Sequence, residues 1–152
     1  MADYSPTWEE IAGQWRDVLG QALGYTVYYP YPDNAVDAFE LPCVVINEPT
    51  GFSANPFTFG AVTASYTGRV TLLVLAVETE QATLSSMDNN KILAAGLTFC
   101  LAVHANQKLK SYWTHVSLGE GEIGRISPYD PDMRGNYAGM IIPYTIQMQY
   151  RS

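Results

Sequence analysis

The chain of 152 residues has little charge, and least of all positive charge. Charged residues make up 15% of the sequence, against about 25% in an ordinary soluble protein. Only eight residues are Lys or Arg, fifteen are Asp or Glu, and the net charge is −7. Because so few cations are available to neutralise phosphates, this balance argues against nonspecific binding to nucleic acid. We expect that DNA can pass close to this protein without being held by it.

Cysteine, histidine and long apolar runs are also scarce. The two cysteines, Cys43 and Cys100, fall in an apolar run and in an expected helix, which favours small buried thiols over a disulfide. His104 and His115 have no Cys or His near them at metal-ligand spacing, so we interpret them as a helix-end residue and a surface or interface residue. No segment approaches about 18 uninterrupted apolar residues, and the N-terminus lacks a basic region followed by an apolar core. We therefore expect a soluble protein made in a cytoplasm, with no membrane partner.

The clearest helical pattern covers residues 8–23. Apolar side chains recur there at the i, i+3, i+4, i+7 spacing of one helical face, and polar residues fill the other face. Ser5 with Pro6, or the capping box from Thr7 to Glu10, indicates its start. Gly24 is a natural end.

A second helix is expected over about residues 83–105, with Thr83 or Ser85 as its cap. Gly96 lies inside it, where a glycine costs about 1 kcal/mol of helix propensity and usually marks close packing. Its apolar residues are expected on one wide sector, formed by Leu84, Met87, Ile92, Leu93, Leu97, Phe99, Cys100, Leu101 and Val103.

Alternation of apolar and polar residues predicts strands at residues 25–29, 42–48, 62–77, 112–118, 123–127 and 138–150. After Thr71 the longest of them becomes continuously apolar, so we expect that half to be covered on both faces. A strand of this length often projects beyond its own domain. Gly68 is expected to mark a bulge or a bend, and Pro143 to place the last strand at an edge or beside a bulge.

The order of these elements predicts an α+β fold, with a mainly antiparallel mixed β-sheet flanked by two principal α-helices. We expect a single domain over residues 1–152, with extended loops at residues 49–60 and 119–136. Phe52, Phe57 and Phe59 lie in the first loop. They either cover the core locally or form a surface that is buried against another chain.

Three short motifs resemble ligand-binding or catalytic sequences, and their context argues against each. Residues 119–124 match the GxGxxG of dinucleotide-binding turns, but no helix can begin cleanly behind them and their two glutamates would repel a pyrophosphate. Residues 130–135 resemble the start of a calcium loop, but Arg134 and Ile141 occupy ligand positions. Residues 51–55 lack the second glycine of a nucleophile elbow. We therefore predict that the chain is not an enzyme and binds neither a cofactor nor a metal.

The order of three local patterns resembles the tail terminator proteins of long-tailed phages, the group related to the lambda minor tail protein U. The first pattern is the amphipathic helix that ends in Leu23-Gly24. The second is the strand and turn VYYPYPD at residues 27–33, followed by LPCVVI at residues 41–46. The third is the closing strand NYAGMII at residues 136–142. The resemblance covers nearly the whole chain in order.

This resemblance implies a structural virion protein of the phage tail and neck, assembled in the host cytoplasm. Such a protein forms a hexameric ring on the head-proximal end of the tail tube, stops tube polymerisation and offers a joining surface to the head. The implied partners are further copies of the chain, the tail tube protein and a head or neck connector protein, while DNA passes through the lumen without specific binding. The family has no catalytic residues to carry over.

Ten residues are our candidates for contacts with neighbouring subunits or with the tube: Tyr29, Tyr31, Asp33, Phe52, Phe57, Phe59, Arg69, Tyr129, Asp130 and Arg134. Two alternatives to the terminator remain open. One is another neck or head-completion connector protein, which would share a small α+β fold. The other, from a different class, is a small ligand-binding module or enzyme.

Overall fold

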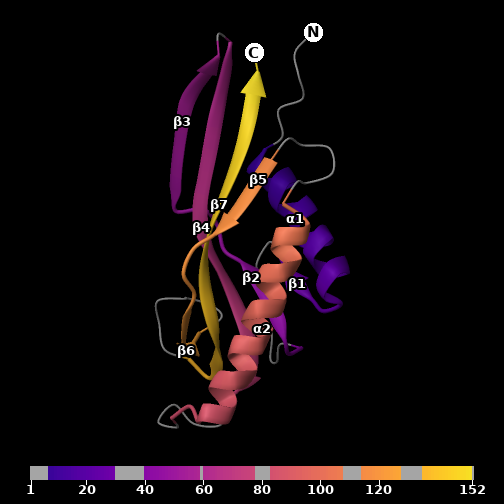
Figure 1. Ribbon diagram of the computed structural model, residues 1–152, viewed down its shortest axis with the longest axis vertical. Coiled ribbons are helices and arrows are strands. Elements are labelled where there is room, and N and C mark those ends of the chain that lie inside the picture. Colours follow the sequence, from indigo (N-terminus) through magenta and orange to yellow (C-terminus); the bar gives the residue numbers. More distant parts are fainter. Residues whose placement is uncertain are drawn as a thin grey trace.

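The computed structural model describes residues 7–29, 40–58, 60–77, 83–107, 114–127 and 135–151. Within them the chain forms two helices and one mixed seven-stranded sheet (Figure 1). The elements are α1 (Trp8–Leu23), β1 (Val27–Tyr28), β2 (Cys43–Ile46), β3 (Gly51–Thr58), β4 (Ala61–Ala76), α2 (Ser86–Ala105), β5 (Thr114–Leu118), β6 (Glu122–Ile126) and β7 (Tyr137–Arg151). The expected α+β fold with a mainly antiparallel sheet is confirmed.

Strands β4 and β7 form the centre of the sheet. They pair antiparallel over nearly their whole length, from Ala61 opposite Arg151 to Ala76 opposite Tyr137. On the side of β4 away from β7, β3 pairs with the first half of β4 and β2 with the second half. On the side of β7 away from β4, β6 and β5 pair with successive parts of β7 in the same way. β1 extends the sheet beyond β2 as a parallel neighbour.

Both helices have the ends that their sequences predict. Thr7 is the N-cap of α1 and accepts a hydrogen bond from the Glu10 backbone N–H at 3.3 Å, which decides between the two starts that the sequence allowed. Gly24 ends α1 at a φ of 74°, in the left-handed region that favours glycine. Ser85 caps α2 in a reciprocal capping box with Asp88.

The main core lies between the helices and one face of the sheet. Ile11, Trp15 and Leu19 of α1 are fully buried in it, beside α2 and the inward side chains of β4 and β7. A smaller cluster covers the opposite face of the sheet, and its buried members are Cys43, Val45, Leu73 and Ile126. Leu72 and Leu73 are therefore covered on the two faces as expected, whereas the apolar run ends in an exposed Ala76.

The loop expected at residues 49–60 is wrong, because residues 51–58 form the strand β3. Their glycine, asparagine and proline disfavour a regular element, but β4 extends past β2 and presents an unpaired edge. β3 pairs with it from Gly51 opposite Thr67 to Thr58 opposite Ala61. Pro56 is tolerated because β3 pairs on one side only among the described residues. Tertiary pairing thus overrides the local propensity.

Gly68 does not mark a bulge. It lies directly opposite Tyr144 in a regular part of the β4–β7 ladder, and the register shift lies between Leu73 and Leu75. A Cβ on Gly68 would be 2.5 Å from Oη of Tyr144 and 2.7 Å from Cζ. The glycine therefore makes room for the tyrosine ring.

Pro143 lies in a central strand, so the expected edge position is wrong and the alternative, a place beside a bulge, holds: between Leu118 opposite Tyr144 and Glu122 opposite Ile141, three residues face two. The proline pairs with Arg69 of β4, and its carbonyl accepts a hydrogen bond from the Gly119 N–H at 2.8 Å on the other side. That side is where β5 ends and β6 has yet to begin. The proline nitrogen faces this gap between the two strands, where no ladder hydrogen bond is required of it.

One end of the sheet extends past the helices as an arm, as the length of the residue 62–77 strand suggested (Figure 1). We define the arm as β3 together with residues 61–67 of β4 and 145–151 of β7, which pair with one another. The two helices cover mainly the other part of the sheet, which we call the body, although Ile146 and Met148 at the base of the arm still belong to the main core. The arm is thus held to the body by continuous strands.

Candidate assembly surfaces

The described residues among the ten candidate contacts do not form one patch. Tyr29 is 7% exposed, so its ring belongs to the core beside Trp8. Phe52 is 66% exposed on β3, on the face of the sheet that carries the helices. Arg69 is half-buried on β4 and points to the opposite face. Phe57 belongs to β3, but its side chain lies outside the described residues, as do Tyr31, Asp33, Phe59, Tyr129, Asp130 and Arg134.

Aromatic rings connect the arm to the core. The Phe52 ring lies 5.4 Å from that of Tyr66, which lies 5.3 Å from Trp8 of α1. Trp8 in turn stacks on Tyr144 at 5.9 Å. Ring pairs at such separations contribute about 0.5–1.5 kcal/mol each beyond their buried area. Phe52 is thus oriented by a supported cluster while most of its surface faces solvent.

Two buried tyrosines in this region have phenol groups that resist ionisation. Burial, followed by a hydrogen bond with Glu48, raises the pKa of Tyr29 to about 12. Burial is also the first cause of a raised pKa for Tyr144, whose hydroxyl donates to the Asn47 carbonyl at 2.8 Å. Both groups are neutral structural donors at physiological pH, and neither is a base.

Four side chains make the outer part of the arm apolar on the helix-bearing side of the sheet. Phe52, Ala54 and Pro56 of β3 pair with Tyr66, Ala64 and Val62 of β4, and alternation places all of them on one face. We call Phe52, Ala54, Pro56 and Val62 the arm face; all four are exposed, Phe52 by 66% and Val62 by 37%. None carries a charge. The arm face is thus the apolar part of this sheet surface that stays exposed, next to Ala64, which is buried.

A second apolar surface lies on α2, where the expected single sector is wrong. The side of the helix that packs on the sheet is formed by Ile92, Gly96, Phe99 and Val103. Met87, Leu93, Leu97 and Leu101 are instead 67%, 52%, 62% and 60% exposed, and we call them the α2 stripe. The last three are spaced four residues apart, so they share the solvent side of the helix. That spacing was visible in the sequence as a second face.

Gly96 confirms that α2 packs closely on the sheet. A Cβ at this position would lie 2.8 Å from Cε of Met140 on β7. The glycine therefore lets the helix backbone approach the sheet, with the α2 stripe on the opposite side.

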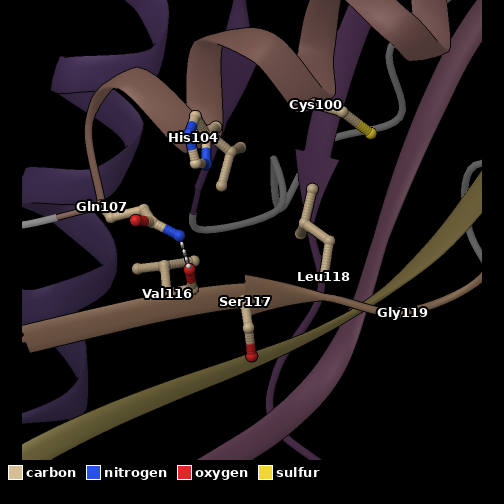
Figure 2. A pocket seen from close by; sticks show the side chains of 8 residues that line it. Cys100, His104, Gln107, Val116, Ser117, Leu118 and Gly119 are labelled. Atoms are coloured by element: carbon tan, nitrogen blue, oxygen red, sulfur yellow. Dashed lines mark hydrogen bonds between the residues drawn. The ribbon is translucent and has the colours of Figure 1, made fainter.

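A cavity of about 330 Å³ lies between the last turns of α2 and β5 (Figure 2). Cys100 and His104 from the helix and Val116 and Leu118 from the strand are among its lining residues, and Gln107 closes one end by donating to the Val116 carbonyl at 3.2 Å. Figure 2 shows that Ser117 points to the other side of β5, and that the thiol and the imidazole do not point toward one another. The cavity therefore holds no arrangement of nucleophile and base.

Neither thiol is activated. Burial raises the pKa of Cys43 to about 12, and burial also raises that of Cys100. Both are free cysteines, and a thiolate is the form that attacks a substrate or binds a metal. Across the described part of the chain, no three His, Cys, Asp or Glu residues are grouped so as to hold a metal ion. No described helix is long and apolar enough to cross a membrane.

The motif at residues 119–124 has a packing explanation. β6 begins at Glu122, so a strand and not a helix follows the first two glycines. A Cβ on Gly119 would press on Pro143, and one on Gly121 would lie 2.5 Å from the Met140 sulfur. Residues 51–55 lie in regular β3 and make no sharp turn, and residues 130–134 of the calcium-like motif lie outside the described residues.

Comparison with known proteins leaves the family open. No protein-family model matches the sequence, and no curated protein gives a significant match to it.

Proposed function

We propose that this chain is a structural virion protein, a tail terminator that assembles as a hexameric ring on the head-proximal end of a phage tail tube. The ring stops tube polymerisation and provides the joining surface to the head. Its partners are copies of itself, the tail tube protein and a connector of the neck. The protein is made in the host cytoplasm and ends up in the virion.

The observation that carries this proposal is the pair of apolar surfaces, the arm face and the α2 stripe, that stay exposed among the described residues. Exposed apolar side chains grouped in this way are typical of surfaces that become buried in an assembly. The order of elements that resembles the terminator family supports the choice of assembly. The arm adds a reach beyond the body that suits contact between neighbouring subunits.

The charge of the chain is compatible with a ring around DNA. Each copy has a net charge of −7, and a ring of such copies has an acidic surface overall. Like charge disfavours contacts with phosphates, so DNA can move through the lumen without being retained. Specific binding of DNA is not part of the proposal.

One observation favours a second candidate, a small ligand-binding module. The volume of the cavity between α2 and β5 lies at the lower end of the range for ligand sites, about 300–1,000 Å³. Its lining is apolar in part and includes the polar side chains of His104 and Gln107. A connector protein of the neck is the alternative within the same structural class. Binding of a small molecule at this cavity would favour the module.

Light scattering coupled to size-exclusion chromatography tests the proposal, with the protein alone and after mixing with tail tube protein. The expected result is a ring-sized particle, either in isolation or on the tube, and tubes whose growth stops when the protein is added. Electron microscopy measures the tube lengths. A protein that stays a monomer and leaves tube growth unchanged would refute the terminator function.

A further inference from the structure

We infer that the α2 stripe of one copy packs on the arm face of the next copy. The contact joins Met87, Leu93, Leu97 and Leu101 of one chain to Phe52, Ala54, Pro56 and Val62 of its neighbour. This contact is the one that would join neighbouring subunits of the proposed ring. The inference rests on the proposed function only in assuming that the contacts close into that ring.

The arm face continues a surface that already binds helices. On the body, the inward residues of β4 and β7 form the main core with α1 and α2. The same face of β4 runs without interruption from Leu72 and Val70 past Tyr66 to Val62, because these residues alternate in register. At Tyr66 it still contacts Trp8 of α1, and the next pair, Ala64 and Met148, is still buried, whereas Val62 and the facing residues of β3 are exposed and no further described helix packs on them. A helix is therefore the element that fits the uncovered part of the face.

Of the two described helices, α2 is the one whose solvent side is apolar. The exposed residues of α1 include Glu9, Glu10, Asp17 and Gln21, so its outer face is polar. In α2 the segment from Leu93 to Leu101 contains no charged residue, and the charged residues Asp88 and Lys91 lie before it. Among the described elements, the α2 stripe is thus the exposed apolar helix surface, and the arm face is the exposed apolar sheet surface that it would match.

The distribution of charge also leaves these two surfaces as a place where a second copy can approach. Two chains of net charge −7 repel one another over most of their surfaces. Neither the arm face nor the segment from Leu93 to Leu101 carries charge, so this contact brings no like charges together. Two copies can therefore approach through these neutral apolar surfaces, whereas charge repulsion opposes contact through the rest of the acidic surface.

The two surfaces differ from each other, so neither surface pairs with its own copy in the proposed contact. The α2 stripe lies on the body, with the body's own sheet on its other side, whereas the arm face lies past the ends of the helices (Figure 1). A contact between unlike surfaces is heterologous, so each copy that uses its stripe still offers its arm face. Such contacts close into a ring or continue as a filament; the smallest closed form is a reciprocal two-fold dimer, and the proposed hexamer is a larger closed form.

Two substitutions, each with a matched control, test the contact. Leu97→Glu places a charge in the α2 stripe, and Gln21→Glu places one on the exposed polar side of α1. Phe52→Glu places a charge in the arm face, and Ser53→Glu places one on the next residue, which is exposed on the opposite face of β3. Circular dichroism and melting temperature establish that all four variants fold.

Sedimentation velocity over a range of concentrations measures the oligomers. Burying an unpaired charge should raise the dissociation constant by about 30-fold or more for Leu97→Glu and Phe52→Glu, while both controls assemble like the wild type. A mixture is the sharpest test, because the Leu97→Glu copy keeps its arm face and the Phe52→Glu copy keeps its stripe. An equimolar mixture should form dimers and nothing larger.

Several results would overturn the inference. A wild-type chain that stays monomeric at the highest concentration would do so, as would a Phe52→Glu variant that assembles normally, since pairing between two stripes would then explain the oligomer. Tube capping separates this failure from failure of the proposed function. If wild type and both variants stop tube growth equally, the contact is wrong and the terminator function stands. If wild type forms the heterologous contact and tubes keep growing, the contact stands and that function is wrong.

Discussion

Gly68→Ala should destabilise this protein, although glycine is usually the weaker residue in a strand. Replacing a strand glycine with alanine is worth about 0.5–1 kcal/mol when the new methyl group has space. At Gly68 the methyl carbon would lie 2.5 Å from Oη and 2.7 Å from Cζ of Tyr144. The ring cannot easily retreat, because Tyr144 is 1% exposed and lies 5.3 Å from the ring of Trp15 and 5.9 Å from that of Trp8.

The magnitudes decide the sign. Overpacking of a buried site costs about 1–3 kcal/mol, and a displaced tyrosine also weakens its hydrogen bond to the Asn47 carbonyl, at about 0.5–1.5 kcal/mol. After the gain from alanine is subtracted, we expect the free energy of unfolding to fall by about 2 kcal/mol, within a range of about 0.5–4. For a domain of this length, a loss of 2 kcal/mol lowers the melting temperature by about 4–8 °C.

Urea unfolding followed by circular dichroism measures this loss, with Gly124→Ala as the matched control. Gly124 is also in a strand and has a φ outside the left-handed region, and a Cβ there would meet nothing within 4 Å. The control should therefore be neutral or slightly stabilised. In a Tyr144→Leu background, Gly68→Ala should lose most of its cost. A Gly68→Ala variant as stable as the wild type would refute the explanation of this glycine by the tyrosine ring.

Three further predictions concern the helices and the thiols. Thr7→Ala should lower the melting temperature by about 2–4 °C, because the lost N-cap is worth about 1 kcal/mol and the Glu10 amide loses its acceptor; Thr7→Ser should restore most of it. On α2, Phe99→Ala should cost about 3–5 kcal/mol in urea unfolding and Leu97→Gln less than about 0.5, and equal losses would contradict the two-faced helix. Cys43 should react with a thiol reagent far more slowly than Cys100. Its pKa rises from 9.0 to about 12 on folding, so its contribution to stability is complete below pH 9 and is lost as the pH rises toward 12.

Long periodic segments were predictable because many residues in each point to the same structure. The helix at residues 8–23 and its end at Gly24 follow from local spacing and backbone chemistry, and Thr7 was one of the two starts that these allowed. The two long strands β4 and β7 have more than ten residues of pattern each, so their bounds agree with expectation within a residue or two. The sequence is sufficient to predict an element when the residues that determine it lie close together in the chain.

The errors arose where pairing with another strand supplies the constraint. β3 forms because β4, the next strand in the chain, offers it an edge, although its own residues favour a loop. Pro143 is tolerated in a central strand because β5 and β6, which lie far from it in the sequence, meet beside it. The candidate contacts met the same limit: Tyr29 looked available in the sequence, but it packs into the core beside Trp8 of α1. For Phe52 the sequence left both a core position and an exposed position open, and it is 66% exposed.

The packing of a single chain does not explain why the exposed residues of the α2 stripe are apolar. Leucine has nearly the same helix propensity as glutamine, glutamate or lysine, so helix formation does not require Leu93, Leu97 and Leu101. The core does not require them either, since they are 52%, 62% and 60% exposed and the opposite side of α2 already packs on the sheet. On a chain with 15% charged residues, each exposed leucine also lowers solubility. Their side chains gain the hydrophobic free energy of burial only when another surface covers them, and the proposed contact with a second copy would supply that burial.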